Sequence, residues 1–111
     1  MRKHVVRCVV AMAALVVVVP AQADEAVFTL TIKDHQFQPA QIEIPAGRKV
    51  KLLVRNQDAT PEEFDSHDLN REKVIAGGQE ATIFIGPLSP GSYSFMGEFH
   101  AQTAQGKVIA K

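Results

Sequence analysis

Short segments in which apolar and polar residues alternate recur from residue 26 to residue 110, and turn residues separate them. A period of two places every second side chain on the same face of an extended strand. In residues 26–32, for example, Phe28, Leu30 and Ile32 share one face. The alternation, or a short apolar run, also occurs at 41–44, 48–55, 82–85, 92–96 and 107–110. About seven strands with turns roughly every 8–12 residues predict an all-β fold, a Greek-key β-sandwich.

The charged segment from Glu62 to Lys73 interrupts this pattern. It is too polar to predict a central strand, because charged side chains are seldom buried without a partner. Phe64, near the start of the segment, is expected to anchor it to the core. No internal repeat, low-complexity tract or second domain is visible in the sequence.

The first 23 residues have the three parts of a secretory signal peptide. A basic start, residues 1–7, precedes an apolar run from Cys8 to Val19, and small residues follow at Ala21 and Ala23. The apolar run is shorter than the roughly 20 residues that a membrane span needs. We therefore expect cleavage after Ala23 rather than an uncleaved anchor, and a mature domain of residues 24–111 in the periplasm.

Removal of the signal peptide leaves 111 − 23 = 88 residues, and it removes three of the 12 basic residues but none of the 12 acidic ones. The resulting negative balance gives no reason to expect nucleic acid or anionic lipid as a partner. The sole cysteine, Cys8, leaves with the signal peptide, so the mature chain has no thiol. A metal site in this domain must therefore use His, Met, carboxylate or backbone ligands.

Two segments far apart in the sequence carry the side chains best suited to hold a metal ion, residues 60–68 and 95–100. Loops separated in this way can meet at one end of a Greek-key sandwich. First-row transition metals accept their mixture of imidazole, thioether and carboxylate groups. The candidate metal ligands are His100, Glu98, Met96, Glu62, Glu63 and His67.

His100 is the strongest of these candidates, because its tight loop is expected to face the mouth of the sandwich; the alternative is a structural, hydrogen-bonded His. His67 points away from the core by strand parity, so a solvated side chain is an equal alternative to a ligand. Met96 is expected at the rim, either as a soft ligand for Cu(I) or as a packing residue. Glu98 shares the parity of His100 and can complete a site, or it is a solvated charge.

Glu62 and Glu63 are adjacent, so in a strand they face opposite ways and only one of them can join a given site. Parity with Phe64 favours Glu62, although residues near a loop need not alternate strictly. Carboxylates also suit iron ions, which adds physical support for iron chemistry.

The segment from Pro90 to His100 resembles the copper-binding segment of cupredoxins, which has the form Pro-Gly-x-Tyr-x-Phe-x-Cys-x-x-His. Gly97 stands where a blue-copper protein has its cysteine, and Glu62 stands where such proteins present their first histidine. Among the usual ligands only His100 aligns directly. The resemblance therefore implies a cupredoxin-like fold, while the departures exclude a site of the blue-copper type.

A narrower resemblance rests on the string from Glu63 to Ile75, together with residues 86–88 and 95–100. These segments are similar to the EfeO-type cupredoxin-like domain and, within that group, to the small periplasmic cupredoxin-like subunit of bacterial Ftr-type ferrous-iron uptake systems. The resemblance implies that the metal chemistry serves the oxidation or delivery of iron, which makes iron a candidate substrate. The ion that we expect at the site is copper, with iron as the alternative. The resemblance also implies a membrane iron permease and associated periplasmic subunits as partners.

The function that follows is that of a periplasmic metal-binding protein, which supports the oxidation of ferrous iron or its delivery to the permease. A ferroxidase-type activity is one form of this function. Two alternatives stay open: a periplasmic carrier of copper or iron without redox turnover, and a metal-free accessory subunit that only docks a partner. The sequence has no Gly-rich phosphate loop and no Ser-His-Asp spacing that stands out from background.

Overall fold

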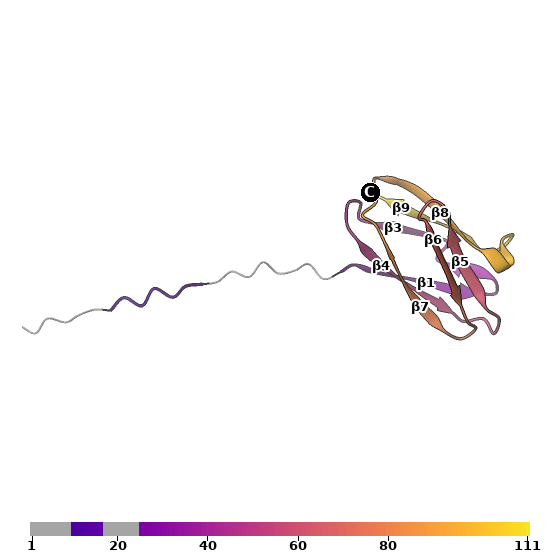
Figure 1. Cartoon of the computed structure of the whole chain (residues 1–111), viewed down its shortest axis with the longest axis horizontal. Coiled ribbons are helices and arrows are strands. Elements are labelled where there is room, and N and C mark those ends of the chain that lie inside the picture. Colours follow the sequence, from indigo (N-terminus) through magenta and orange to yellow (C-terminus); the bar gives the residue numbers. More distant parts are fainter. Residues whose placement is uncertain (1–9, 17–24) are drawn as a thin grey trace, which may run out of the picture.

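The computed structural model describes residues 10–16 and 25–111, and all the strands in this part of the chain lie between Val27 and Ala110 (Figure 1). Most of the expected signal peptide, residues 1–23, lies outside the described residues, and so does Cys8. Cleavage after Ala23 therefore stays a prediction. Among the residues described, no helix is long and apolar enough to span a membrane.

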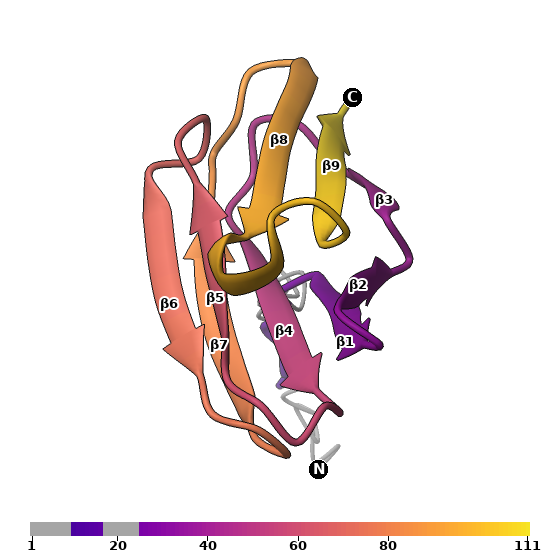
Figure 2. The same cartoon turned by 90° about the vertical axis from the view of Figure 1, so that its right-hand side faces the viewer.

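Two sheets pack against each other to form a sandwich, which Figure 2 shows from the end that carries the site discussed below. The four-stranded sheet has the order β2–β1–β4–β7, with β1 (Val27–Lys33), β2 (Gln36–Gln38), β4 (Val50–Asn56) and β7 (Glu80–Ile85). The five-stranded sheet has the order β3–β9–β8–β5–β6, with β3 (Gln41–Ile44), β9 (Gln105–Ala110), β8 (Gly91–Gly97), β5 (Glu62–Ser66) and β6 (Arg71–Ile75). A single 3₁₀ turn in the described part, η1 (Glu98–His100), follows β8.

Strands that are distant in sequence lie side by side in both sheets: β1 is parallel to β4, and β3 is parallel to β9. The other neighbouring strands are antiparallel. The predicted all-β sandwich is confirmed, with nine strands in the described residues. Three of the nine strands lie outside the six segments named from the sequence: β2, which has three residues, β5, and β6, whose side chains are mostly exposed.

The position of β5 corrects the prediction that the segment starting at Glu62 is too polar for the inside of a sheet. β5 lies between β6 and β8, whereas the edge strands of this sheet are β3 and β6. Its side chains alternate, so that Glu62, Phe64 and Ser66 are buried. The buried polar groups have partners: Ser66 Oγ donates a hydrogen bond to the carbonyl of Ser94 (2.7 Å) and accepts one from the amide of Leu69 (3.0 Å). A strand with satisfied polar groups can occupy an interior position.

Three phenylalanines form the aromatic part of the core, and each comes from a different strand: Phe37, Phe64 and Phe95. The ring centroids of Phe64 and Phe95 are 5.1 Å apart, and the ring of Phe37 meets that of Phe95 edge-on at 4.9 Å. These separations are those of favourable aromatic pairs. The cluster therefore ties β2, β5 and β8 together below the end of the sandwich from which η1 projects.

Phe64→Ala is expected to lower the free energy of unfolding by about 3–5 kcal/mol, because it leaves a cavity between the two sheets. Phe84→Ala is the matched control, since Phe84 is 41% exposed on β7. Its cost is expected to be about 1 kcal/mol or less. Urea denaturation of the two variants measures both values, and equal losses would contradict the assignment of Phe64 to the core.

Candidate metal centre

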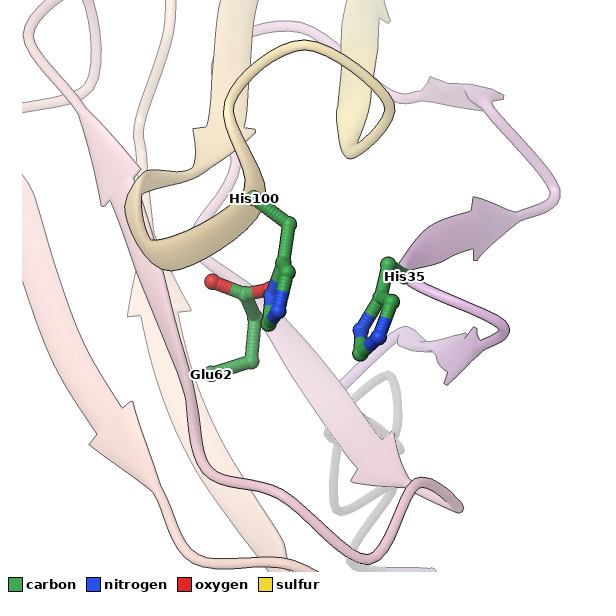
Figure 3. A group of neighbouring side chains, drawn as sticks. All are labelled: His35, Glu62 and His100. Carbon is green, nitrogen blue, oxygen red and sulfur yellow. The ribbon is translucent and has the colours of Figure 1, made fainter.

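Three side chains from three different elements converge at one end of the sandwich, and Figure 3 shows them pointing toward one another. His35 lies in the turn between β1 and β2, Glu62 begins β5, and His100 ends η1. Each offers one ligand atom, and these atoms all lie within 4.8 Å of one another. Two imidazoles and a carboxylate therefore share one small space.

Glu62 is the buried member of the group, with a side chain that is 1% exposed. Its Oε1 accepts hydrogen bonds from the backbone amides of Glu63 (3.0 Å) and Phe99 (2.9 Å). Its Oε2 lies 2.5 Å from Nδ1 of His100. A buried carboxylate is costly unless both its oxygens have partners. Here both do, so the carboxylate is held in one orientation.

His100 is positioned by the compact loop that joins β8 to β9. Its carbonyl accepts hydrogen bonds from the amides of Ala104 (2.8 Å) and Thr103 (3.1 Å), and the amide of Gly97 donates to the carbonyl of Ala104 (2.8 Å). These bonds close residues 97–104 into a tight turn. The imidazole contacts the carboxylate of Glu62, but its side chain is 28% exposed, so one side of the ring faces solvent.

His35 reaches the site because its turn has an uncommon backbone conformation, with φ of 53° at Asp34 and 56° at His35. Asp58 holds this turn: its Oδ1 accepts from the amide of Asp34 (2.8 Å), and its Oδ2 accepts from the amide of His35 (3.0 Å). The side chain of Thr103 adds a further bond, since its Oγ1 donates to the carbonyl of His35 (2.7 Å). The two histidine-bearing loops are therefore tied to each other.

The same contacts change the acidity of Asp58. The hydrogen bond from the His35 amide is the main reason that the pKa of Asp58 lies below its ordinary value. The bond from Asp34 and the nearby imidazoles of His35 and His100 act in the same direction, while burial opposes them.

The imidazoles of His35 and His100 stack on each other, with centroids 3.6 Å apart and planes 14° from parallel. Nδ1 of His35 is buried and has no hydrogen-bond partner among the described residues. Oδ2 of Asp58 is 3.4 Å from it, within the distance of an ion pair, but the two are not aligned for a hydrogen bond. An unpaired buried nitrogen is unfavourable. A metal ion bound at this site would give the imidazole of His35 a partner through one of its two nitrogens.

The donor set itself fits a first-row transition metal. Nitrogen and oxygen ligands of one ion lie about 2.0–2.2 Å from it, and thus about 3–4 Å from each other. Ligand atoms within 4.8 Å of one another are close enough to bind one ion, provided that the two stacked imidazoles turn so that both ring planes point at it. Two imidazoles and one carboxylate suit Cu(II) and Fe(II), whereas soft Cu(I) prefers sulfur ligands.

Of the six residues proposed from the sequence, the structure brings Glu62 and His100 together and places the others elsewhere. Met96 lies on the outer face of β8, with 40% of its surface exposed. His67 is exposed in the turn after β5. Met96 and His67 line a shallow groove on the outer face of the five-stranded sheet, which does not include Glu62 or His100.

Glu63 and Glu98 join a separate group of carboxylates with Glu72, whose oxygen atoms lie within 4.8 Å of one another. Partial burial, followed by the charges of Glu98 and Glu72, raises the pKa of Glu63. Glu62 and Glu63 thus face opposite sides of β5, as their adjacency predicts, and only Glu62 meets the two histidines.

His35 is the member of the group that sequence reasoning missed. Its segment contains a single histidine in a polar turn, without a second ligand nearby in the sequence. One signal could have found it: His35 precedes Phe37 by two residues, just as Glu62 precedes Phe64. In both cases the ligand is two positions from an aromatic core residue.

Asp58→Ala is expected to weaken the binding of Cu(II) by about tenfold or more, because loss of a group that orients a ligand has effects of this size. Asp68→Ala is the matched control, since Asp68 also accepts a backbone hydrogen bond, from Ser94 (2.9 Å), outside the His35 turn. Calorimetric titration with Cu(II) measures both affinities. Equal affinities of the two variants would show that Asp58 does not position His35.

Comparison with known proteins places this chain in a family. A family model described as a cupredoxin-like domain matches residues 6–110. An uncharacterized protein of Rickettsia prowazekii (strain Madrid E) is 48% identical over 80 residues, which cover 72% of this chain and 64% of the relative. The chain thus spans slightly less than two thirds of the length of that relative.

Solved structures agree in fold at low sequence identity. Auracyanin A, a blue copper protein from Chloroflexus aurantiacus, superposes with a TM-score of 0.68 at 12% identity, over 78% of this chain and 99% of that chain. The metal-binding domain of the Cu(I)-exporting ATPase CopA from Streptococcus pneumoniae D39 gives 0.65 at 15% identity, over 77% and 84%. Amicyanin from Paracoccus versutus gives 0.60 at 19% identity, over 83% and 86%. With the family match across nearly its whole length, the chain belongs to the cupredoxin-like domain family.

Proposed function

We propose that this protein is a periplasmic copper-binding cupredoxin-like protein that supports the oxidation of ferrous iron or its delivery to a membrane iron permease. The observation that carries the proposal is the convergence of His35, Glu62 and His100 at one end of the sandwich. The three side chains would hold the copper ion. When bound, copper supplies one-electron chemistry, since Cu(II) can accept an electron from Fe(II).

The residues around the site prepare it for an ion. Glu62 is fixed by two backbone amides, so its carboxylate is already aimed at His100. Asp58 fixes the turn that carries His35. Ligands held in place before binding lose little conformational freedom when the ion arrives, which favours affinity.

The site is open on one side, which an exchange of iron or electrons with a partner requires. The side chains of His35 and His100 are 43% and 28% exposed. They line a shallow depression together with Phe99 and residues 101–103. The carboxylates of Glu63, Glu72 and Glu98 lie on β5, β6 and η1 and give this end of the molecule a negative field that attracts cations.

The chemistry differs from that of the blue-copper relatives. Residues 24–111 contain no cysteine, so no thiolate from the mature domain can bind the ion. Two of the similar structures are described as a blue copper protein and as a metal-binding domain with Cu(I). Copper binding by these proteins supports a copper site here, while the nitrogen and oxygen donors favour the oxidised ion.

The iron role rests on the resemblance to the EfeO-type domain and to the small subunit of Ftr-type uptake systems. The partners proposed on this basis are a membrane iron permease and its associated periplasmic subunits. The basic start and the short apolar run of residues 1–19 support export to the periplasm. Carriage of copper or iron without redox turnover is the nearest alternative, because the same three ligands would serve it.

Single substitutions of the three ligands test the site. His35→Ala, Glu62→Gln and His100→Ala are each expected to weaken Cu(II) binding by about tenfold or more, since each removes one donor atom. His67→Ala is the control, because His67 is exposed away from the triad, and its affinity is expected to stay unchanged. Titration with electron paramagnetic resonance detection measures the affinity and reports nitrogen and oxygen ligation. Unchanged affinity in the three ligand variants would refute the site.

The rate of Fe(II) oxidation separates the functions. For a ferroxidase-type protein, the copper-loaded form is expected to oxidise Fe(II) faster than the copper-free form, and His100→Ala to abolish the difference. Tight copper binding without acceleration would instead establish a carrier. Equilibrium dialysis that shows no binding of Cu(II), Cu(I) or Fe(II) would leave only a docking role.

A further inference from the structure

Gly97 lies directly against the Glu62 carboxylate. It ends β8, is buried, and is the cross-strand partner of Phe64. A Cβ atom added at this position would lie 2.6 Å from Cδ of Glu62 and 2.9 Å from its Oε1. It would also lie 2.7 Å from Cβ of Ala104. Carbon atoms do not approach this closely without a repulsion that forces neighbours to move.

The backbone does not explain why this residue is glycine. Gly97 has φ −91° and ψ 106°, an extended conformation that any residue adopts. Its amide donates an ordinary hydrogen bond to the carbonyl of Ala104. The reason for glycine is therefore space, which the side chains of Glu62 and Ala104 fill.

We propose that Gly97 determines the ligand set of the centre: positions 62 and 97 share one slot beside His100, and the slot holds a carboxylate from β5 because β8 brings no side chain into it. Gly97 is thus a specificity-determining residue. The assignment of Glu62 as a metal ligand rests on the proposed function, whereas the competition of the two positions for space is a property of the metal-free protein.

One consequence is that the donor atom beside His100 can be exchanged. The Cβ of a side chain at position 97 would lie within 3 Å of the Glu62 carboxylate. If position 62 is shortened to alanine, a thiolate carried by position 97 has room to enter the slot. The centre would then offer sulfur in place of oxygen, as blue-copper sites do.

The first test uses the metal-free protein, purified after expression of the full chain. Gly97→Ala is expected to lower the melting temperature by about 5 °C or more, because overpacking of a buried site costs 1–3 kcal/mol. Gly91→Ala is the control on the same strand, since a Cβ there meets no atom closer than 3.8 Å. In a Glu62→Ala background, the loss caused by Gly97→Ala is expected to fall below half, with the remainder due to Ala104.

Each result of this cycle decides the question. An equal loss of melting temperature in both backgrounds would show that the added Cβ at position 97 clashes only with Ala104, and it would overturn the proposal. If Gly97→Ala alone does not fold, a folded double variant still supports the shared slot, and an unfolded double variant beside a folded Glu62→Ala single variant refutes it. Because no metal is present, failure of this cycle is distinct from failure of the copper site.

The second test concerns the metal. Gly97→Ala is expected to weaken Cu(II) binding by about tenfold or more, as removal of an orienting contact does, with Gly91→Ala unchanged. The double variant Gly97→Cys with Glu62→Ala is expected to give an intense visible absorption with Cu(II), which Glu62→Ala alone lacks. If the unaltered protein binds copper, wild-type affinity in Gly97→Ala, or a copper-loaded double variant without the visible band, would overturn the shared slot. If the unaltered protein binds no copper while the metal-free coupling holds, the proposed function fails and the slot stands.

Discussion

The buried carboxylate of Glu62 is the group around which this end of the molecule is organised. It joins two elements that are far apart in the sequence, because the backbone amide of Phe99 and the imidazole of His100 both bind it. A carboxylate that is removed from water without such partners would cost several kcal/mol. The hydrogen bonds that satisfy the carboxylate also place η1 against β5. The carboxylate that is the proposed metal ligand is thus also the group that joins η1 to β5, which links the stability of this region to the proposed function.

The aromatic cluster supplies the rigid base for that joint. Phe37, Phe64 and Phe95 lie two residues from His35, Glu62 and Gly97, respectively. Glu62 and Gly97 continue the inward-facing rows of β5 and β8 beyond Phe64 and Phe95, because side chains two apart on a strand share a face. The core and the centre are therefore successive layers of one column. The packing of the three phenylalanines therefore sets the distances between the side chains of the centre, since close-packed interiors transmit displacements rather than absorb them.

Much of the fold could be predicted from alternation alone, and the inward sides of β1 and β4 are buried as expected. Parity with Phe64 also favoured Glu62 over Glu63. Two features were out of reach for physical reasons. The interior position of β5 depends on hydrogen bonds to Glu62 and Ser66 that only the tertiary structure provides. His35 depends on a turn with positive φ, which Asp58 stabilises from a distant loop, and no local pattern reports such a contact.

The hydrogen bond from Thr103 to the carbonyl of His35 bears on the rates of electron transfer and ion exchange in the proposed function. It spans the gap between the two histidine-bearing loops, so their separation is set before an ion enters. In the proposed copper protein, this bond would keep the two loops in place while the charge of the ion changes by one unit. Small rearrangement lowers the barrier to electron transfer, and it also lets an ion enter and leave without unfolding of the loops. Both properties would serve a protein that handles its cargo in repeated cycles.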